Sequence, residues 1–319
     1  MKINNNSRVA LKDIPEMDYR EFLDSNLELM KEALQRHCVN YFGYICCGKI
    51  KLICCIADDL TGEIFVSSSV VSKDAPLLSF TNQNHNFEKF EREIHENFGI
   101  PYKDHPWLKP FRETGNYQFV KSDSEELHEV GVGPIHAGVI EPGHFRFVCN
   151  GEQVMHLEIA LGYQHRGIED LFLKKQSLLS LATLAENIAG DTVAGHTSAF
   201  ANLWERVSGE ETPEYLHFTR TLALELERIA IHTGDLAAIC ADIAYQLGNS
   251  VYGRLRTPII NFLQQWCGNR LAKGLIRAGK TNFPFTDELA RELDKILSLY
   301  EVDFDEISSK FFKLPSALS

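Results

Sequence analysis

The sequence predicts an α+β protein, with a small N-terminal α+β domain followed by a mainly α-helical domain that has a short β-hairpin at its start. Strand-like segments fill residues 41–70, and helical spacing of apolar residues dominates after residue 165. A polar stretch, KSDSEELHE, lies between the two regions. At 319 residues the chain also exceeds the size that one hydrophobic core usually serves. We therefore assign residues 1–120 to the first domain, 121–130 to a linker and 131–319 to the second domain.

The first domain is expected to alternate helices with a β-meander. Helical spacing predicts a helix over about 19–39. The stretches GYICC and KLICCIAD, separated by Gly48-Lys49, predict a hairpin, and residues 58–62 form a turn before EIFVSSSVV. After the short strand PLLSF, a polar turn leads into a helix over 86–98, which Gly99 ends.

The second domain is expected to begin with a hairpin and continue in helices. HFRFVCNGEQVMHLEIAL alternates apolar and polar residues around a turn at Asn150-Gly151. The clearest helix covers 213–247, where apolar residues form one stripe. On its polar side Glu225 and Arg228 have the spacing of a surface ion pair.

Composition excludes several functional classes. The formal net charge of −12 argues against nucleic acid as a direct partner, because phosphate binding needs clustered Lys and Arg. No stretch approaches the roughly 18 to 20 apolar residues of a membrane helix, so we expect no direct membrane span and a membrane role only through partners. The eight cysteines contain no C-x-x-C pair, and the N-terminus has no apolar run after its charges. Reduced thiols in the cytoplasm are the simplest interpretation.

Four motifs follow one another in the second domain. They are G-P-x-H at 133–136, E-P-x-x-F at 141–145, N-G-E at 150–152 and G-Y-x-H-R-G-I-E at 162–169. In this order they resemble the large subunit of energy-converting (group 4) nickel–iron hydrogenases and its relative, the quinone-site subunit of respiratory complex I. Upstream, EREIHENFGIPYKDHPWLKPF resembles the accessory subunit that lies beside it in both assemblies. The resemblance therefore implies a fusion of the two subunits in one chain.

The segment AENIAGDTVAGH at 185–196 departs from the hydrogenase pattern. In the hydrogenases, two cysteines of this segment help to hold nickel and iron, because soft thiolates bridge two metals well. Here Ala189 and Thr192 stand in their places. Alanine has no donor atom and a threonine hydroxyl is a poor ligand, so we predict no nickel–iron cluster and no metal ligands. The family's second cysteine pair would lie beyond Ser319, so the resemblance implies a chain that is shortened at its C-terminus.

The resemblance also implies site residues. In the complex I relative, the cavity without a metal cluster becomes a quinone site, so a quinone is the candidate ligand. His136 of G-P-x-H would donate a hydrogen bond or a proton to a quinone oxygen. Histidine suits this role because its pKa ordinarily lies near neutrality. The candidate catalytic residues are His136, Glu186 and His196, and the candidate quinone-binding residues are His136, His165 and Arg166. The tyrosine that the family uses would fall near Ala189, and residues 164–196 contain none.

Structural interpretations of the same residues remain open. Asp191 or Thr192 could cap the following helix. His165 and Glu169 could share a helical face in a buried network or a proton relay. Glu186, a proton carrier by resemblance, could instead bond to Arg166 or to a backbone amide.

The resemblance implies a subunit of a membrane-associated complex I-like or energy-converting hydrogenase-like oxidoreductase. Its partners would be an iron–sulfur subunit and integral membrane subunits, and it would lie on the cytoplasmic face of the inner membrane through them. The chain has no flavin motif, nucleotide loop or cluster-binding cysteine set, so we expect it to bind no cofactor of its own apart from a candidate quinone. The alternatives are a non-catalytic structural subunit and a true nickel–iron hydrogenase.

Overall fold

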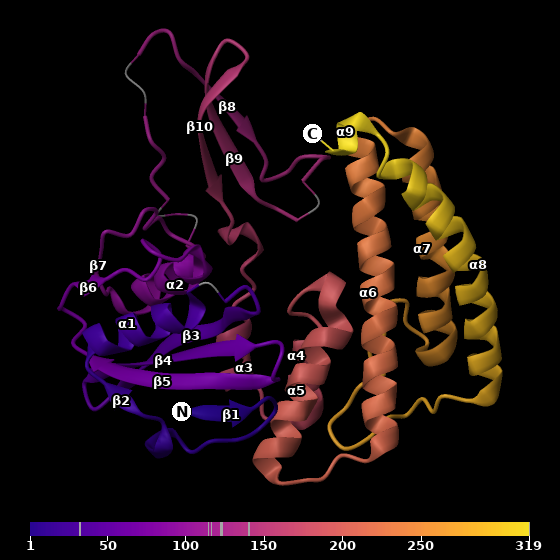
Figure 1. Ribbon diagram of the computed structural model, residues 1–319, viewed down its shortest axis with the longest axis horizontal. Coiled ribbons are helices and arrows are strands. Elements are labelled where there is room, and N and C mark those ends of the chain that lie inside the picture. Colours follow the sequence, from indigo (N-terminus) through magenta and orange to yellow (C-terminus); the bar gives the residue numbers. More distant parts are fainter. Residues whose placement is uncertain (32, 114, 116, 122–123, 140, 319) are drawn as a thin grey trace. The chain divides into compact units, whose positions relative to one another are not determined.

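The computed structural model describes residues 1–319 except residues 32, 114, 116, 122–123, 140 and 319. The chain divides into two compact units, Met1–His165 and Arg166–Ser319. Sheets in the first unit and helices in both confirm the α+β class (Figure 1). The predicted domain boundary at 121–130 rests on the polar composition of that stretch and stays a prediction.

A five-stranded sheet forms the base of the first unit. Its strands are β1 (Lys2–Asn4), β2 (Glu16–Met17), β3 (Arg36–Cys46), β4 (Lys49–Asp58) and β5 (Glu63–Val71). The order is β1-β5-β4-β3, all antiparallel, and β2 pairs with β5 in parallel. The long β3–β4–β5 meander confirms the predicted β-structure of residues 41–70.

Helices α1 (Tyr19–Met30) and α2 (Glu88–Phe98) pack on this sheet (Figure 1). Between them lies an aromatic core in which Phe80 and Phe87 stack at 4.5 Å between ring centroids and Tyr41 lies 5.2 Å from Phe80. Burying such side chains contributes about 1.5–3 kcal/mol each. Gly99 ends α2 with a φ of 72°, as the sequence predicts.

The predicted helix over 19–39 is too long. The helix ends at Met30, and residues 36–39 belong to β3, where Arg36 pairs with Asp58 at 2.8 Å and Cys38 is buried. Pairing with β4 outweighs the local helical spacing, because it satisfies the backbone of the whole segment. The hairpin turn is also shifted by one residue: Cys47 and Gly48 have φ values of 50° and 77°, and Lys49 already pairs with Cys46.

The first unit continues with short elements, among them a two-stranded sheet and a three-stranded sheet. These elements are the 3-10 helices η1 (Leu11–Asp13), η2 (His85–Phe87) and η4 (Gly162–Gln164), and the strands β6 (Leu77–Leu78), β7 (Tyr102–Lys103), β8 (His128–Val132), β9 (His144–Asn150) and β10 (Gln153–Ala160). Strands β8, β9 and β10 form an antiparallel sheet that contains the predicted hairpin. Gln153 pairs with Asn150, so its turn is Gly151-Glu152, one residue later than predicted. Residues 128–130 of the predicted linker lie in β8.

The second unit is helical. Its elements are α3 (Ile168–Lys174), α4 (Leu178–Ala185), η5 (Gly190–Thr192), α5 (Val193–Ser208), α6 (Glu214–Asp242), α7 (Gln246–Cys267), α8 (Asp287–Phe311) and α9 (Pro315–Leu318). Small residues let α5 and α6 approach closely: Ala194 and Ala201 on α5 are fully buried in one core with Ala223 and Leu226 on α6. The predicted helix over 213–247 is in fact two helices, α6 and α7. The chain leaves helical geometry between them at Ala244, which has a φ of 59°.

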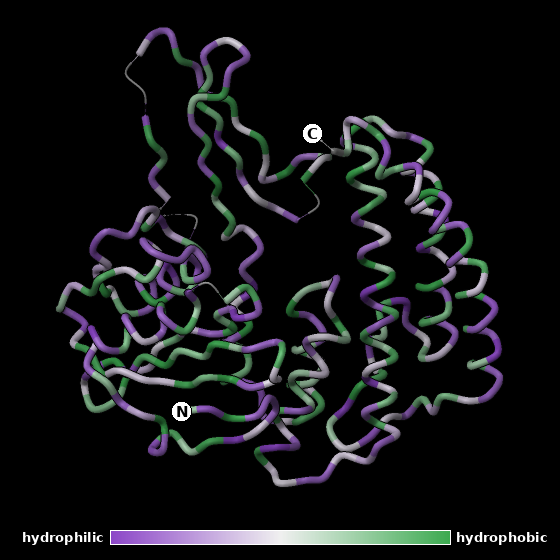
Figure 2. The backbone as a smooth tube through the Cα atoms, viewed as in Figure 1, coloured by the Kyte–Doolittle hydropathy of each residue, from purple (hydrophilic) through white to green (hydrophobic). Residues whose placement is uncertain are grey.

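Hydrophilic positions recur along α6 (Figure 2). Within the part of the chain that the structure describes, none of the helices combines the length and the apolar character that crossing a membrane requires.

Candidate functional site

The segment that departs from the hydrogenase pattern connects α4 to α5. Helix α4 begins at the cap Ser177, whose hydroxyl accepts the amide of Ser180, and ends at Ala185. Extended backbone at Ala189 then leads into η5, so Ala189 and Thr192 lie on either side of Gly190 and Asp191. The two positions at which the hydrogenases have thiolates are thus separated by one short turn.

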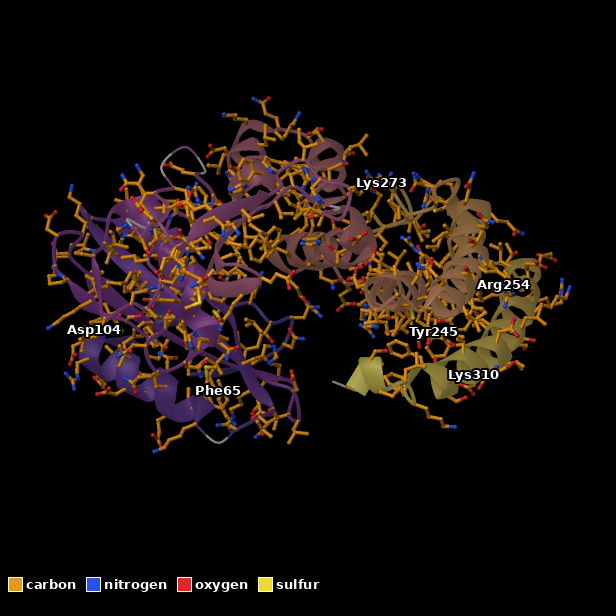
Figure 3. The ribbon with its side chains drawn as sticks, turned by 90° about the horizontal axis from the view of Figure 1, so that it is seen from above. Phe65, Asp104, Tyr245, Arg254, Lys273 and Lys310 are labelled. Carbon is orange, nitrogen blue, oxygen red and sulfur yellow. The ribbon has the colours of Figure 1, made fainter. Side chains whose placement is uncertain are left out.

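The Glu186 side chain bonds to residues of the connection between α7 and α8. Its carboxylate is 4% exposed and accepts from the amide of Gly274 at 2.6 Å and from Nη1 of Arg277 at 2.5 Å. Lys273, labelled in Figure 3, adds a bond from its Nζ to Asn187 Oδ1 at 2.8 Å. The predicted backbone-amide bond of Glu186 is confirmed. Its charged partner is Arg277 and not Arg166, because Arg166 donates to the carbonyl of Ile188 at 3.0 Å.

Glu227 on α6 caps helix α5, a role that the sequence suggested for other residues. Its two oxygens accept the amides of Ala194 at 2.6 Å and Gly195 at 3.0 Å. The Thr192 side chain occupies the N-cap position but accepts no backbone amide of the helix, so the prediction that it caps α5 is wrong. In the sequence, Glu227 is one of several charged residues on one helix, and only the packing of α5 on α6 distinguishes it from its neighbours.

His196 lies in the first turn of α5 and is half-buried. Its Nδ1 lies 2.7 Å from Thr192 Oγ1 and 2.9 Å from the Thr192 carbonyl oxygen. Because a carbonyl only accepts, Nδ1 carries the proton in that bond. Thr192, at the second lost thiolate position, therefore orients His196.

A cavity of about 10 Å³ lies beside η5, and about this volume holds a single water molecule. Two carboxyl groups, two guanidinium groups and an aliphatic wall surround it: Gly190, Asp191, Glu227, Ala230, Ile231, Arg256, Ile260, Leu263, Arg270 and Leu271. Burial raises the pKa of Glu227; the Asp191 carboxylate raises it further, while the two amide bonds and His196 oppose the shift without cancelling it. A carboxyl that retains its proton more readily than usual thus lies next to the lost thiolate positions.

These residues do not fit a nickel–iron cluster. Ala189 offers no donor atom, and the Thr192 hydroxyl is engaged with His196. Throughout the described residues, no group of three or more His, Cys, Asp or Glu is placed to hold a metal ion.

His136 lies in the loop between β8 and β9 and is exposed. Its Nδ1 accepts the amide of Gly138 at 3.0 Å, so the neutral ring carries its proton on Nε2 and can donate from there. The loop requires glycine at 133, where φ is 86° and a Cβ would collide with the Gly143 carbonyl oxygen. Its base is held by His144, whose Nδ1 lies 3.1 Å from the carbonyl oxygen of Gly133.

The structure distributes the remaining candidates between the units. His165 follows η4, and α3 begins only at Ile168, after Gly167 with a φ of 62°. His165 and Glu169 therefore do not lie on one helix. The shared-face interpretation requires one helix for both residues, so it does not hold. His136 and His165 belong to the first unit, whereas Arg166, Glu186 and His196 belong to the second. Arg166 and Glu186 both stabilise the segment around Ile188, and the functional roles of all five residues stay predictions.

The upstream E-R-E motif lies in α2 and bonds to the chain on both sides of that helix. Glu91 is fully buried and accepts from Ser79 Oγ at 2.6 Å and from the amide of Phe80 at 2.8 Å. Arg92 donates to the carbonyls of Lys109 and Pro110, each at 2.8 Å. Glu91 therefore holds the segment before α2 and Arg92 holds the proline-rich segment after it, and these contacts are structural.

Comparison with known proteins identifies relatives of the chain. No protein-family model matches the chain. Hydrogenase-4 component G of Escherichia coli (strain K12) is 26% identical over 208 residues, which cover 65% of this chain and 38% of that protein. An NADH-quinone oxidoreductase subunit of Clostridium beijerinckii is 25% identical over 187 residues, covering 57% of this chain and 50% of that protein. The chain thus spans half or less of the length of these curated relatives.

A solved structure shares the fold. In the membrane-bound sulfane sulfur reductase, an archaeal respiratory membrane complex, one chain superposes with a TM-score of 0.57 at 16% identity, over 62% of this chain and 52% of that one. The sequence matches agree with the order of motifs from G-P-x-H to G-Y-x-H-R-G-I-E, and together they show which proteins this chain is related to. The chain is a homologue of the large subunits of energy-converting nickel–iron hydrogenases and of the quinone-site subunit of respiratory complex I.

Proposed function

We propose that this chain is a subunit of a membrane-associated oxidoreductase of the complex I and energy-converting hydrogenase type, in which it has no metal centre of its own. Its homology to subunits of both kinds of complex supports the first part. The observation that carries the second is the pair Ala189 and Thr192 at the thiolate positions, with Thr192 bonded to His196. Residues 1–120 would act as the fused accessory subunit.

In this proposal the chain takes part in electron transport by placing hydrogen-bond donors and titratable groups, while electrons arrive from an iron–sulfur partner. A quinone headgroup accepts hydrogen bonds at its carbonyl oxygens, and the exposed Nε2–H of His136 can supply one. His165 and Arg166 are the further candidate quinone-binding residues that the resemblance implies. Integral membrane partners would hold the chain at the cytoplasmic face of the membrane.

Purification from the native membrane tests the assembly. A tagged chain, solubilised in mild detergent, should co-purify with an iron–sulfur subunit and integral membrane subunits in equal amounts. Metal analysis of that complex should find far less than one nickel per copy of the chain. Recovery of the chain alone would contradict the assembly, and one nickel per chain with hydrogen turnover would establish a true hydrogenase.

A photoreactive quinone analogue tests the ligand. Labelling of the assembled complex near His136 should disappear in His136→Ala and persist in His128→Ala, which removes another exposed histidine, in β8. Equal labelling of both variants and the wild type, or no labelling of this chain, would favour the structural-subunit alternative.

A further inference from the structure

We propose that Glu227 is a proton-exchanging carboxyl, which takes up a proton from a water molecule in the cavity beside η5 and receives it from the surface through Asp191. This inference rests on the proposed function, because it names the group through which the metal-free site would handle protons. It differs from the resemblance, which points to Glu186.

Glu227 is placed to hold a proton and still remain ordered. Its oxygens each accept one backbone amide, from Ala194 and Gly195, so each keeps a further lone pair. The side chain is half-buried and lines the cavity. Protonation of one oxygen would leave the other to cap α5, so the helix start survives both protonation states.

The cavity has the size and the polar lining that a bound water requires. Arg256 contributes an Nε that is inaccessible to solvent and has no hydrogen-bond partner among the described residues. A buried N–H is seldom left without a partner, and water is the usual remedy. With about 10 Å³ available, one water can accept from Arg256 Nε and donate to Glu227.

Charged groups face Glu227 from every element packed around it. Asp191 comes from η5, His196 from α5, Arg256 from α7 and Arg270 from the connection that follows α7. Asp191 and Arg270 are exposed, so they lie where the cavity meets solvent. Asp191 is therefore the carboxyl that can exchange protons with bulk water and pass them inward.

The electrostatics agree with this geometry. Burial raises the pKa of Glu227, and Asp191 adds to the shift because two neighbouring carboxylates disfavour each other's charge. A raised pKa brings a carboxyl closer to the neutral range in which proton exchange is efficient. The neighbouring candidates differ: Glu186 is paired with Arg277 and Glu205 with Arg220, at 2.5 and 2.6 Å.

The transfer involves protons only. A proton from bulk water binds the Asp191 carboxylate, moves to the cavity water as that water gives one of its own protons to Glu227, and leaves Asp191 ionised again. One O–H bond breaks and one forms for each proton that moves, and no electron moves.

Carboxyl titration of the full chain tests the proposal. With ¹³C-labelled glutamate side chains, NMR should show the Glu227 carboxyl with a midpoint above the ordinary glutamate range, in addition to the signal of Glu91, whose pKa burial also raises. The Glu227 signal should be lost in Glu227→Gln and should persist in Glu225→Gln, which alters the same helix two residues away in an exposed ion pair. Asp191→Asn should move the midpoint down by removing a negative charge, and Arg256→Met should move it up.

If Glu227→Gln does not fold, the Asp191→Asn and Arg256→Met variants still decide the test, because the shifts that they cause identify the Glu227 signal. A Glu227 midpoint at or below the ordinary glutamate range, or a midpoint that does not change in Asp191→Asn, would overturn the proposal. Glu227 would then be only a helix cap. The outcome is separable from the proposed function: a chain that co-purifies with its partners but lacks this titration loses the proton-exchange role of Glu227 and keeps its place in the complex.

Discussion

At the scale of single residues, the helical unit contains carboxyls with opposite electrostatics. Glu205 is 2% exposed and accepts from Arg220 Nη2 at 2.6 Å, Thr212 Oγ1 at 2.6 Å and the amide of Gly279 at 2.6 Å. Burial alone would raise its pKa, but these bonds outweigh burial and lower the pKa to about 2. Glu227, bonded only to amides and close to Asp191, has a raised pKa. Pairing with an arginine is what separates a structural carboxylate from a titratable one here.

Arg220→Ala should strongly destabilise the chain. The change leaves Glu205 ionised and buried without its partner, and breaking a buried pair in this way costs about 3–5 kcal/mol. Urea denaturation of the full chain measures the loss. Arg228→Ala is the matched control on the same helix, because its pair with Glu225 is exposed and is worth less than about 1 kcal/mol. Equal effects of the two changes would mean that burial does not set the strength of the Glu205 pair.

The stability of the chain should fall in acid because of Glu205. Its folded pKa of about 2 lies below its ordinary 4.5, so the folded state binds fewer protons than the unfolded state between these values. The contribution is complete above about pH 4.5 and is lost as the pH falls toward 2. Denaturation midpoints measured across this range should decline less steeply in Glu205→Gln. A parallel decline in both proteins would assign the acid effect to other groups.

At the scale of elements, the corner between α6 and α7 depends on the close approach of Gly248 to the side chains of Tyr245 and Cys240. A Cβ at Gly248 would lie 2.5 Å from Tyr245 Cδ1 and 2.6 Å from Cys240 Sγ. Tyr245 is labelled in Figure 3, beside the break between the two helices. Glycine at 248 therefore lets the first turn of α7 pack against the end of α6.

Gly248→Ala and Gly253→Ala should change stability in opposite directions. Both glycines lie in α7, but a Cβ at Gly253 meets no atom within 4 Å. Gly248→Ala should destabilise by about 1–3 kcal/mol through overpacking, whereas Gly253→Ala should stabilise by about 0.5–1 kcal/mol through helix propensity. Thermal melting compares them. A stable Gly248→Ala protein would show that Tyr245 can move aside at little cost.

At the scale of the whole molecule, the proposed assembly predicts how the chain attaches to membranes. If partner subunits hold it there, alkaline carbonate should release it from native membrane vesicles, because high pH separates peripheral subunits without extracting integral ones. Immunoblots of supernatant and pellet measure the release, and an integral partner subunit is the control that should stay in the pellet. Retention of this chain in the pellet would require an attachment that the proposal does not include.

Much of the architecture could be predicted from the sequence because it follows from local patterns. Alternation and turn residues located the β3–β4–β5 meander and the β9–β10 hairpin, and Gly99 marked the end of α2. Errors came where local spacing was ambiguous: residues 36–39 joined β3, and the helix over 213–247 broke at Ala244. Hairpin turns were misplaced by one residue, since register depends on pairing along the whole strand.

The sequence by itself determined the similarity to hydrogenase and complex I subunits and the absence of thiolates at Ala189 and Thr192, because motif order and side-chain chemistry follow directly from residue identity. Only the tertiary structure decided what the titratable residues do. Glu186 and Glu227 look alike in the sequence, yet one faces Arg277 and the other caps α5 beside Asp191. The physical reason is that a carboxyl's proton affinity depends on burial and on neighbouring charges, and those neighbours come from helices that lie far apart along the chain.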